Sequence, residues 1–214
     1  MTLSEPIRQQ AKPSRPFWVS ILLLTAYGMI RFGCETQLNA MGAYASYVFE
    51  VIFAFLIWSI FRPNLALRFS PDKSLGYAGV IALATGFGIY KLAAYASIDI
   101  PFDLSENETI LFLLLIGPVV EELVFRMALW EPLSNLLPRT SLVILISSAI
   151  FSFAHFVAWW HVPESLRAFV LYQTTYTFLL GLYCGWLRAK YGSILSNILF
   201  HALFNLAFFV GAHV

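Results

Sequence analysis

Long apolar segments dominate the chain, and most polar residues gather in the short intervals between them. Each apolar segment is close to the about 20 residues that a helix needs to cross about 30 Å of hydrocarbon. We predict about seven such helices, with roughly six to eight possible. Their approximate bounds are 17–30, 44–61, 75–98, 108–130, 141–160, 168–187 and 193–211. The pattern therefore predicts an all-α fold, a polytopic bundle of transmembrane helices.

The composition supports a membrane protein without a soluble part. Of the 214 residues, 59% are hydrophobic and 12% are charged, whereas about a quarter of a soluble domain is charged. Seven spans of about 20 residues occupy most of the chain. We therefore expect one integral membrane domain over residues 1–214, with its motif-bearing core over residues 108–212.

The basic residues predict how the bundle is oriented, because cytoplasmic loops are enriched in lysine and arginine. With a cytoplasmic amino terminus, only Arg31 and Arg167 fall outside. The basic residues that fall inside are Arg8, Lys12, Arg15, Arg62, Arg68, Lys73, Arg139, Arg188 and Lys190. We expect the amino terminus inside, the first helix retained rather than cleaved, and a multi-pass protein of the cell membrane, which is the inner membrane in a Gram-negative cell. The lipid bilayer is then its surroundings.

Net charge and cysteines exclude little and add no site. The formal net charge is +1, and no segment is typical of a nucleic-acid-binding module, so we expect no nucleic acid partner. Cys34 and Cys184 predict neither a disulfide framework nor a cysteine-based metal site.

Three charged residues stand in the fourth predicted span, within Gly117-Pro-Val-Val-Glu121-Glu122-Leu-Val-Phe-Arg126. A charge at the centre of a membrane helix costs about 2.5–3.5 kcal/mol on insertion scales, so each needs a partner or a purpose. Glu122 and Arg126 are one helical turn apart and can form an ion pair, whereas Glu121 points about 140° away from Arg126. The trio is either a structural salt bridge with a spare carboxylate or a functional site; the surplus carboxylate favours function.

Pro118 precedes the two carboxylates and has no N–H group. In a regular α-helix this leaves the carbonyl of Leu114 without a donor. We predict that the helix is kinked or restarts just before Glu121, and irregular helices at membrane depth usually line a cavity.

Two later spans carry histidines at helical spacing from other side chains. Phe151 and His155 lie four residues apart on the fifth span, and His201 and Asn205 lie four apart on the seventh. A lone histidine is often only a core residue, but polar groups are scarce inside a bilayer, which favours a functional role. Asn205 adds hydrogen-bond donors on the face of His201.

Glu50 and Lys91 are also placed inside predicted spans, at similar depths from the outer side. Neither has a second polar neighbour at helical spacing. We predict that these two residues form a structural ion pair between helices.

The three motifs together resemble a known family. EExxxR at Glu121–Arg126, FxxxH at Phe151–His155 and HxxxN at His201–Asn205 occur, in this order, in the CPBP family of intramembrane proteases, also called the Abi or type II CaaX prenyl endopeptidase-like family. The resemblance covers residues 121–205, and each motif alone is weak.

The resemblance implies a glutamic-type intramembrane protease. Glu121 and His155 would activate a water that attacks the scissile carbonyl, while His201 and Asn205 would stabilise the oxyanion. Glu122 would hold the site through Arg126, and Phe151 would support it. The substrate would be a membrane-bound or hydrophobic peptide or protein.

We expect no cofactor. Members of this family were long regarded as metalloproteases, and Glu121, His155 and His201 could in principle bind zinc, which accepts such ligands. No HExxH motif is present, and a metal-independent enzyme explains the same residues.

Two other functions stay open. A proton-coupled transporter or an immunity factor could use the same glutamate and histidines as a proton relay. A membrane scaffold could carry the residues without using them, in which case Glu121→Gln leaves the phenotype intact.

Overall fold

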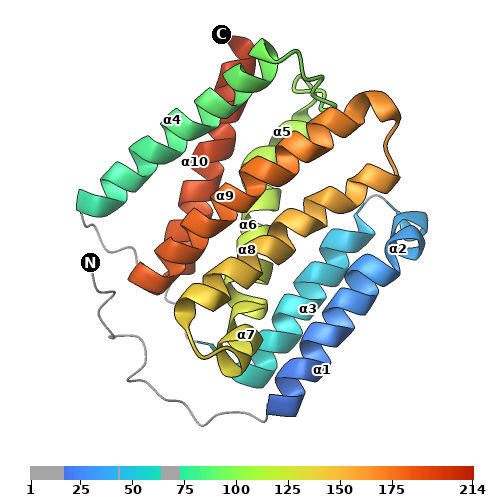
Figure 1. Cartoon of the computed structure of the whole chain (residues 1–214), viewed down its shortest axis with the longest axis vertical. Helices are drawn as coiled ribbons and strands as arrows, with labels where there is room; N and C mark the ends of the chain where they lie inside the picture. Colours follow the sequence, from blue (N-terminus) through green and yellow to red (C-terminus); the bar gives the residue numbers. More distant parts are fainter. Residues whose placement is uncertain (1–16, 43, 64–72) are drawn as a thin grey trace.

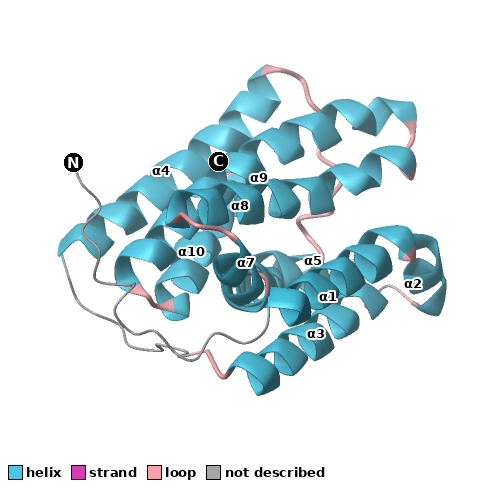
Figure 2. Ribbon diagram, turned by 60° about the horizontal axis from the view of Figure 1, so that its bottom comes forward, coloured by secondary structure: helices cyan, strands magenta, loops and turns pink. Residues whose placement is uncertain are grey.

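The computed structural model describes residues 17–42, 44–63 and 73–214, and these residues form helices and connections without a strand (Figure 2). The all-helical fold class is therefore confirmed. The basic residues Arg8, Lys12, Arg15 and Arg68, on which the predicted orientation partly depends, lie outside the described residues. The orientation remains a prediction.

The helices follow the predicted apolar segments closely. In chain order they are α1 (Phe17–Gly28), the π-helix η1 (Met29–Gly33), α2 (Glu35–Met41), α3 (Ala45–Phe61), α4 (Lys73–Tyr95), α5 (Asn107–Leu111), the π-helix η2 (Phe112–Ile116), α6 (Gly117–Leu123), the π-helix η3 (Val124–Ala128), α7 (Trp130–Leu136), α8 (Thr140–Phe156), the 3₁₀ helices η4 (Val157–Trp160) and η5 (Glu164–Leu166), α9 (Arg167–Tyr191) and α10 (Ile194–His213).

Three of the described helical stretches are long and apolar enough to cross a membrane: Gly76–Tyr95, Thr140–Trp160 and Ile194–His213. Two shorter apolar stretches, Phe17–Gly33 and Ala45–Phe61, coincide with predicted spans. The count of seven spans thus stays a prediction.

The fourth predicted span is the least regular part of the bundle. Residues 107–136 form five short segments in which the π-helices η2 and η3 flank α6. Pro118 lies in the first turn of α6, so the helix restarts just before Glu121, as predicted from the missing N–H. The two carboxylates therefore stand on a short α-helix between two π-helices, which occur frequently at functional sites.

The remaining helices pack as pairs around this irregular segment. Figure 1 shows α4 beside α10, α8 beside α9 and α1 beside α3, with α5, α6 and α7 passing through the middle. Figure 2 shows α7 between α1 and α8. Each of these pairs thus borders the segment that carries the EExxxR motif or its continuation.

Glycines let two of these pairs approach closely. A Cβ added at Gly86 of α4 would overlap the backbone carbonyl of Phe204 on α10, and one at Gly211 would come within 3.0 Å of Tyr90. On α9, a Cβ at Gly181 would lie 3.0 Å from Ser148 of α8. Small residues at such crossings are the usual device for packing membrane helices, because apolar burial adds little inside lipid.

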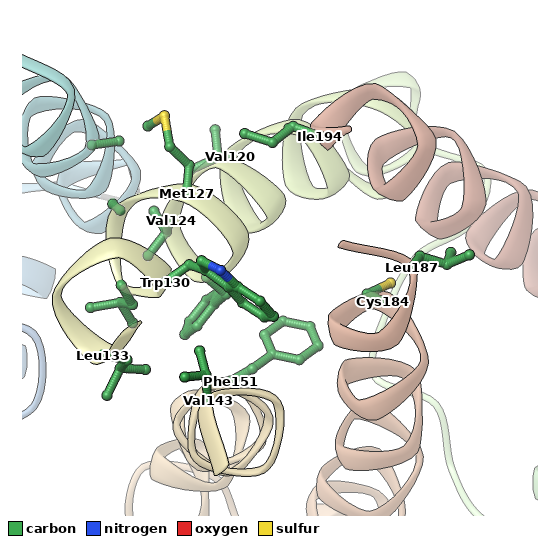
Figure 3. Packing of buried hydrophobic residues seen from close by; sticks show 14 of the residues in the cluster. Val120, Val124, Met127, Trp130, Leu133, Val143, Phe151, Cys184, Leu187 and Ile194 are labelled. Atoms are coloured by element: carbon green, nitrogen blue, oxygen red, sulfur yellow. The ribbon is translucent and has the colours of Figure 1, made fainter. Parts of the chain in front are cut away.

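The core lies where η3, α7, α8, α9 and α10 meet. Figure 3 shows Trp130 of α7 and Phe151 of α8 near one another, with Leu187 of α9 to the right and Ile194 of α10 above. Phe151, Leu187 and Ile194 are fully buried. Phe151, which belongs to this cluster, is also four residues before His155 on α8, so the core borders the segment that carries the FxxxH motif.

Candidate active site

Glu122 is the centre of the polar network. Its side chain is 0% exposed, and its Oε2 lies 3.3 Å from Nε of Arg126, one helical turn away. Its Oε1 accepts a hydrogen bond from Nδ1 of His201 on α10 at 3.0 Å. The predicted ion pair between Glu122 and Arg126 is therefore confirmed, and the structure adds His201 as a third member.

Arg126 is held from several directions although it is fully buried. Its NH2 group donates to the carbonyl of Gly181 on α9 at 3.1 Å. Its guanidinium carbon lies 5.0 Å from the ring centre of Phe151, which is within the range of a cation–π contact. Phe151 in turn packs edge-on against the rings of His155 and His201, at 5.0 and 6.0 Å between centres. Phe151 thus connects the buried ion pair to both histidines.

Glu121 has a different environment from its neighbour. The side chain of Glu121 is 20% exposed, and its Oε2 lies 3.7 Å from Nε2 of His201. His201 therefore stands between the two carboxylates. Because Nδ1 donates to Glu122, Nε2 of a neutral His201 ring carries the lone pair and faces Glu121. At 3.7 Å these two atoms are just beyond hydrogen-bond distance, while Glu122 holds the ring.

His155 has one ring nitrogen held by the backbone. Its Nδ1 lies 3.0 Å from the backbone carbonyl of Phe151. A carbonyl only accepts, so Nδ1 carries the proton and Nε2 of the neutral ring is the acceptor. Such a nitrogen can take a hydrogen bond from a water.

Asn205 is tied to the irregular helix by one N–H. Its Nδ2 donates to the carbonyl of Leu113 at 2.7 Å. This carbonyl has lost both of its usual donors. The N–H of Gly117 bonds Phe112 instead, in the π-helical register, and the next residue in that register is Pro118, which has none. A regular α-helix would leave the carbonyl of Leu114 without a donor. In the π-helical register the carbonyl without a backbone donor is instead that of Leu113, and Asn205 donates to it.

The polar residues line one cavity of about 560 Å³. Glu121, His155, His201 and Asn205 all border it, although they come from α6, α8 and α10. Glu122 and Arg126 lie behind its wall. Much of the remaining lining is aromatic, from Tyr44, Tyr47, Phe102, Phe112, Tyr176, Phe204 and Phe208. An apolar cavity with a few convergent polar groups is the common form of a small-ligand or substrate site.

The predicted pair of Glu50 and Lys91 is wrong. Oε1 of Glu50 accepts a hydrogen bond from Nε of Arg31 at 3.0 Å, whereas Nζ of Lys91 lies 5.4 Å from the ring centre of Phe87. Matching depths did not determine the partner, because α4 packs on α10 rather than on α3.

Two further residues of the polar network, Asn197 and Arg188, were not predicted from the sequence. Nδ2 of Asn197 donates to the carbonyl of Cys184 at 2.6 Å, and Nε of Arg188 donates to the carbonyl of Arg126 at 3.0 Å. Asn197 stands one helical turn before His201, which is a signal that could reveal it. The sequence places Arg188 among the cytoplasmic loop charges, yet it is only 8% exposed.

The donor set also bears on whether the site could hold a metal. Within residues 17–42, 44–63 and 73–214, no group of three or more His, Cys, Asp or Glu side chains is arranged to hold a metal ion. Nδ1 of His201 is engaged with Glu122, which leaves Nε2 alone for any other ligand. A histidine whose Nδ1 donates to a carboxylate keeps Nε2 for a metal as well as for a proton, so the absence of a metal stays a prediction.

A glutamate and a histidine that face each other at 3.7 Å beside a cavity, among apolar helices, indicate a membrane protein with an embedded polar site. Residues 106–207 match the family model described as type II CAAX prenyl endopeptidase Rce1-like. The chain therefore carries an Rce1-like domain of the CPBP family, and all three predicted motifs lie within the matched segment. At the level of the family this supports a CAAX-type intramembrane endopeptidase. No curated protein and no solved structure gave a significant match to the chain.

Proposed function

We propose that this protein is a metal-independent intramembrane endopeptidase in which Glu121 is the general base. The observation that carries the proposal is the chain of contacts from Glu121 through His201 and Glu122 to Arg126, at the wall of a cavity large enough for a peptide side chain. It gives one carboxylate access to the cavity and keeps its neighbour paired with Arg126 and His201. A base with access and a fixed partner is what hydrolysis requires.

The reaction follows from the positions of the groups. A water held by Glu121 and by Nε2 of His155 attacks the carbonyl carbon of the scissile bond, and its proton passes to the Glu121 carboxylate. A C–O bond forms and the carbonyl oxygen takes the negative charge. When the tetrahedral intermediate collapses, the C–N bond breaks and Glu121 returns the proton to the leaving nitrogen. Glu121 is thus first a base and then an acid.

His201 and Asn205 stabilise the oxyanion. Asn205 uses one N–H on Leu113, so its second N–H is available for the cavity. Nε2 of His201 donates only once it has taken the proton of a Glu121 carboxylic acid, a transfer that precedes the attack. This leaves the Glu121 carboxylate to act as the base and places the imidazolium between two carboxylates that favour its charge until the water's proton reaches Glu121. Removing a single donor of this kind typically lowers kcat by about 10²–10³-fold.

The aromatic lining favours a hydrophobic peptide or a membrane-bound protein as substrate, reached from within the bilayer. We place the protein as a multi-pass protein in the cell membrane, which is the inner membrane if the cell is Gram-negative, with lipid as its surroundings and no nucleic acid partner.

The proposal is tested by comparing peptide amino termini in cells that produce the wild-type protein, Glu121→Gln or Glu164→Gln at equal levels. Glu164 is exposed in η5, so its substitution is a matched control. Terminus-enriched mass spectrometry should find termini that depend on Glu121 and are unaffected by the control. These termini also name the substrate, whose synthetic peptide can then be cleaved by the purified protein in lipid nanodiscs.

Two results would contradict the proposal. If Glu121→Gln abolishes the effect that the protein has on its cells but changes no peptide amino terminus, a proton relay accounts better for the carboxylates. If it changes neither termini nor phenotype, the residues are part of a scaffold.

A further inference from the structure

Helix α9 carries none of the three motifs, yet one face of it contacts the elements that carry the EExxxR and HxxxN motifs. The carbonyl of Gly181 accepts from Arg126 at 3.1 Å, and the carbonyl of Cys184 accepts from Asn197 at 2.6 Å. One turn further, Nε of Arg188 donates to the carbonyl of Arg126 at 3.0 Å. Positions 181, 184 and 188 follow helical spacing, so they lie on one face.

Arg188 makes a second contact that reaches the start of α10. Its NH1 group donates to the carbonyl of Gly192. Gly192 ends α9 in the left-handed conformation, with φ of 66°, and Ser193 then caps α10. One guanidinium therefore joins the backbone of the EExxxR segment to the turn from which α10 begins.

We propose that Arg188 is a positioning residue of the active site. It sets α10, and with it His201, against the two carboxylates of α6. The contact between Nε2 of His201 and Glu121 is 3.7 Å, just beyond a hydrogen bond, so a small shift of α10 decides whether it forms. Displacements of about 1 Å from outside the reacting groups can change rates by about 10²-fold.

An arginine suits this role and a lysine does not. The planar guanidinium presents several donors in a fixed fork, so it can serve two carbonyls at once. The ammonium group of a lysine is a single point on a flexible stem. Glu131 supplies an opposite charge near Arg188, so Arg188→Lys keeps the local charge balance and removes only the double contact.

The test measures the ring protonation of His201 in the resting protein. Protein in lipid nanodiscs is labelled with ¹⁵N-histidine, and the His201 signals are assigned by their absence in His201→Gln. The wild type should show a protonated, strongly hydrogen-bonded Nδ1, as the contact with Glu122 requires. Arg188→Lys should lose this signature or split it between two forms. Arg167→Lys, the same change near the other end of α9, should leave it unchanged.

Folding is checked by thermal unfolding of each variant, and a second variant covers a failure of Arg188→Lys to fold. Asn197→Ala removes the hydrogen bond from α10 to the carbonyl of Cys184 on α9, together with a contact to Glu122. It should also disturb the His201 signature. A folded Arg188→Lys or Asn197→Ala protein with the wild-type signature of His201 would overturn the inference and leave Arg188 a structural residue.

The inference rests on the proposed function, since positioning matters only if Glu121 and His201 act on a substrate, but its readout needs no substrate. Disturbed His201 signals together with termini that do not depend on Glu121 would contradict the protease alone. Unchanged signals together with Glu121-dependent termini would contradict only the role of Arg188.

Discussion

Replacing Arg126 with methionine removes the positive charge from a fully buried ion pair. The variant loses the 3.3 Å contact with Glu122, the 3.1 Å hydrogen bond to Gly181 and the contact with the Phe151 ring. In this variant Glu122 still accepts the hydrogen bond from His201, but it has no permanent positive charge as a partner. Removing one partner of a buried pair usually costs about 3–5 kcal/mol, because the other charge stays buried and uncompensated.

The cost is measured as the free energy of unfolding in mixed detergent micelles, followed by far-ultraviolet circular dichroism. A loss of about 3–5 kcal/mol lowers the folding equilibrium constant by more than about 100-fold. Arg139→Met is the matched control, since Arg139 is exposed at the start of α8. Surface changes of this kind usually stay within about 0.5 kcal/mol.

A double variant separates the pair from the packing of each residue. Glu122→Met combined with Arg126→Met leaves no unpaired charge, so it should be more stable than Arg126→Met alone. The double variant should remain inactive, because His201 loses the acceptor that fixes its ring. Costs that simply add, or an Arg126→Met protein within about 1 kcal/mol of the wild type, would show that the ion pair does not hold the site.

Three further predictions address the irregular helix, the metal question and the helix crossing. Asn205→Ala should cost about 1 kcal/mol, since it leaves the partly buried carbonyl of Leu113 without a donor. The cost should shrink when Pro118→Ala restores an N–H in the π-helical register, and an equal cost in both backgrounds would refute this account. Removing divalent metal ions with a chelator should leave the cleavage rate unchanged, and activity that is lost and then restored by stoichiometric zinc would show that a metal is needed. Gly86→Ala should destabilise the protein by about 1–3 kcal/mol because its Cβ meets the backbone of Phe204, whereas Gly88→Ala, which meets open space, should not; similar unfolding temperatures for both variants would contradict the close approach of α4 and α10.

Much of the local structure could be predicted from the sequence. The length of each apolar segment predicts a helix, and the helices follow the predicted bounds within a few residues except around Pro118. The pair of Glu122 and Arg126 follows from their spacing on one helix, which fixes which side chains can touch. The three motifs likewise indicated the family that residues 106–207 match.

Contacts between helices could not be predicted in the same way. Depth in the membrane suggested Lys91 as the partner of Glu50, but the rotation and neighbours of each helix gave Arg31 instead. The proposed role of Arg188 depends on the turn at Gly192 and on the backbone carbonyl of Arg126, which belongs to a different helix.

The sequence alone thus determined the helices, their chemistry-bearing residues and the contacts within one helical turn, because these depend on a fixed local geometry. The tertiary structure decided which residue pairs with Glu50, which nitrogen of His201 faces which carboxylate and which carbonyl Asn205 serves. These contacts depend on how each helix is rotated and how closely it approaches its neighbours. The π-helical register around Pro118 changes the rotation, and glycines at the helix crossings allow the close approach.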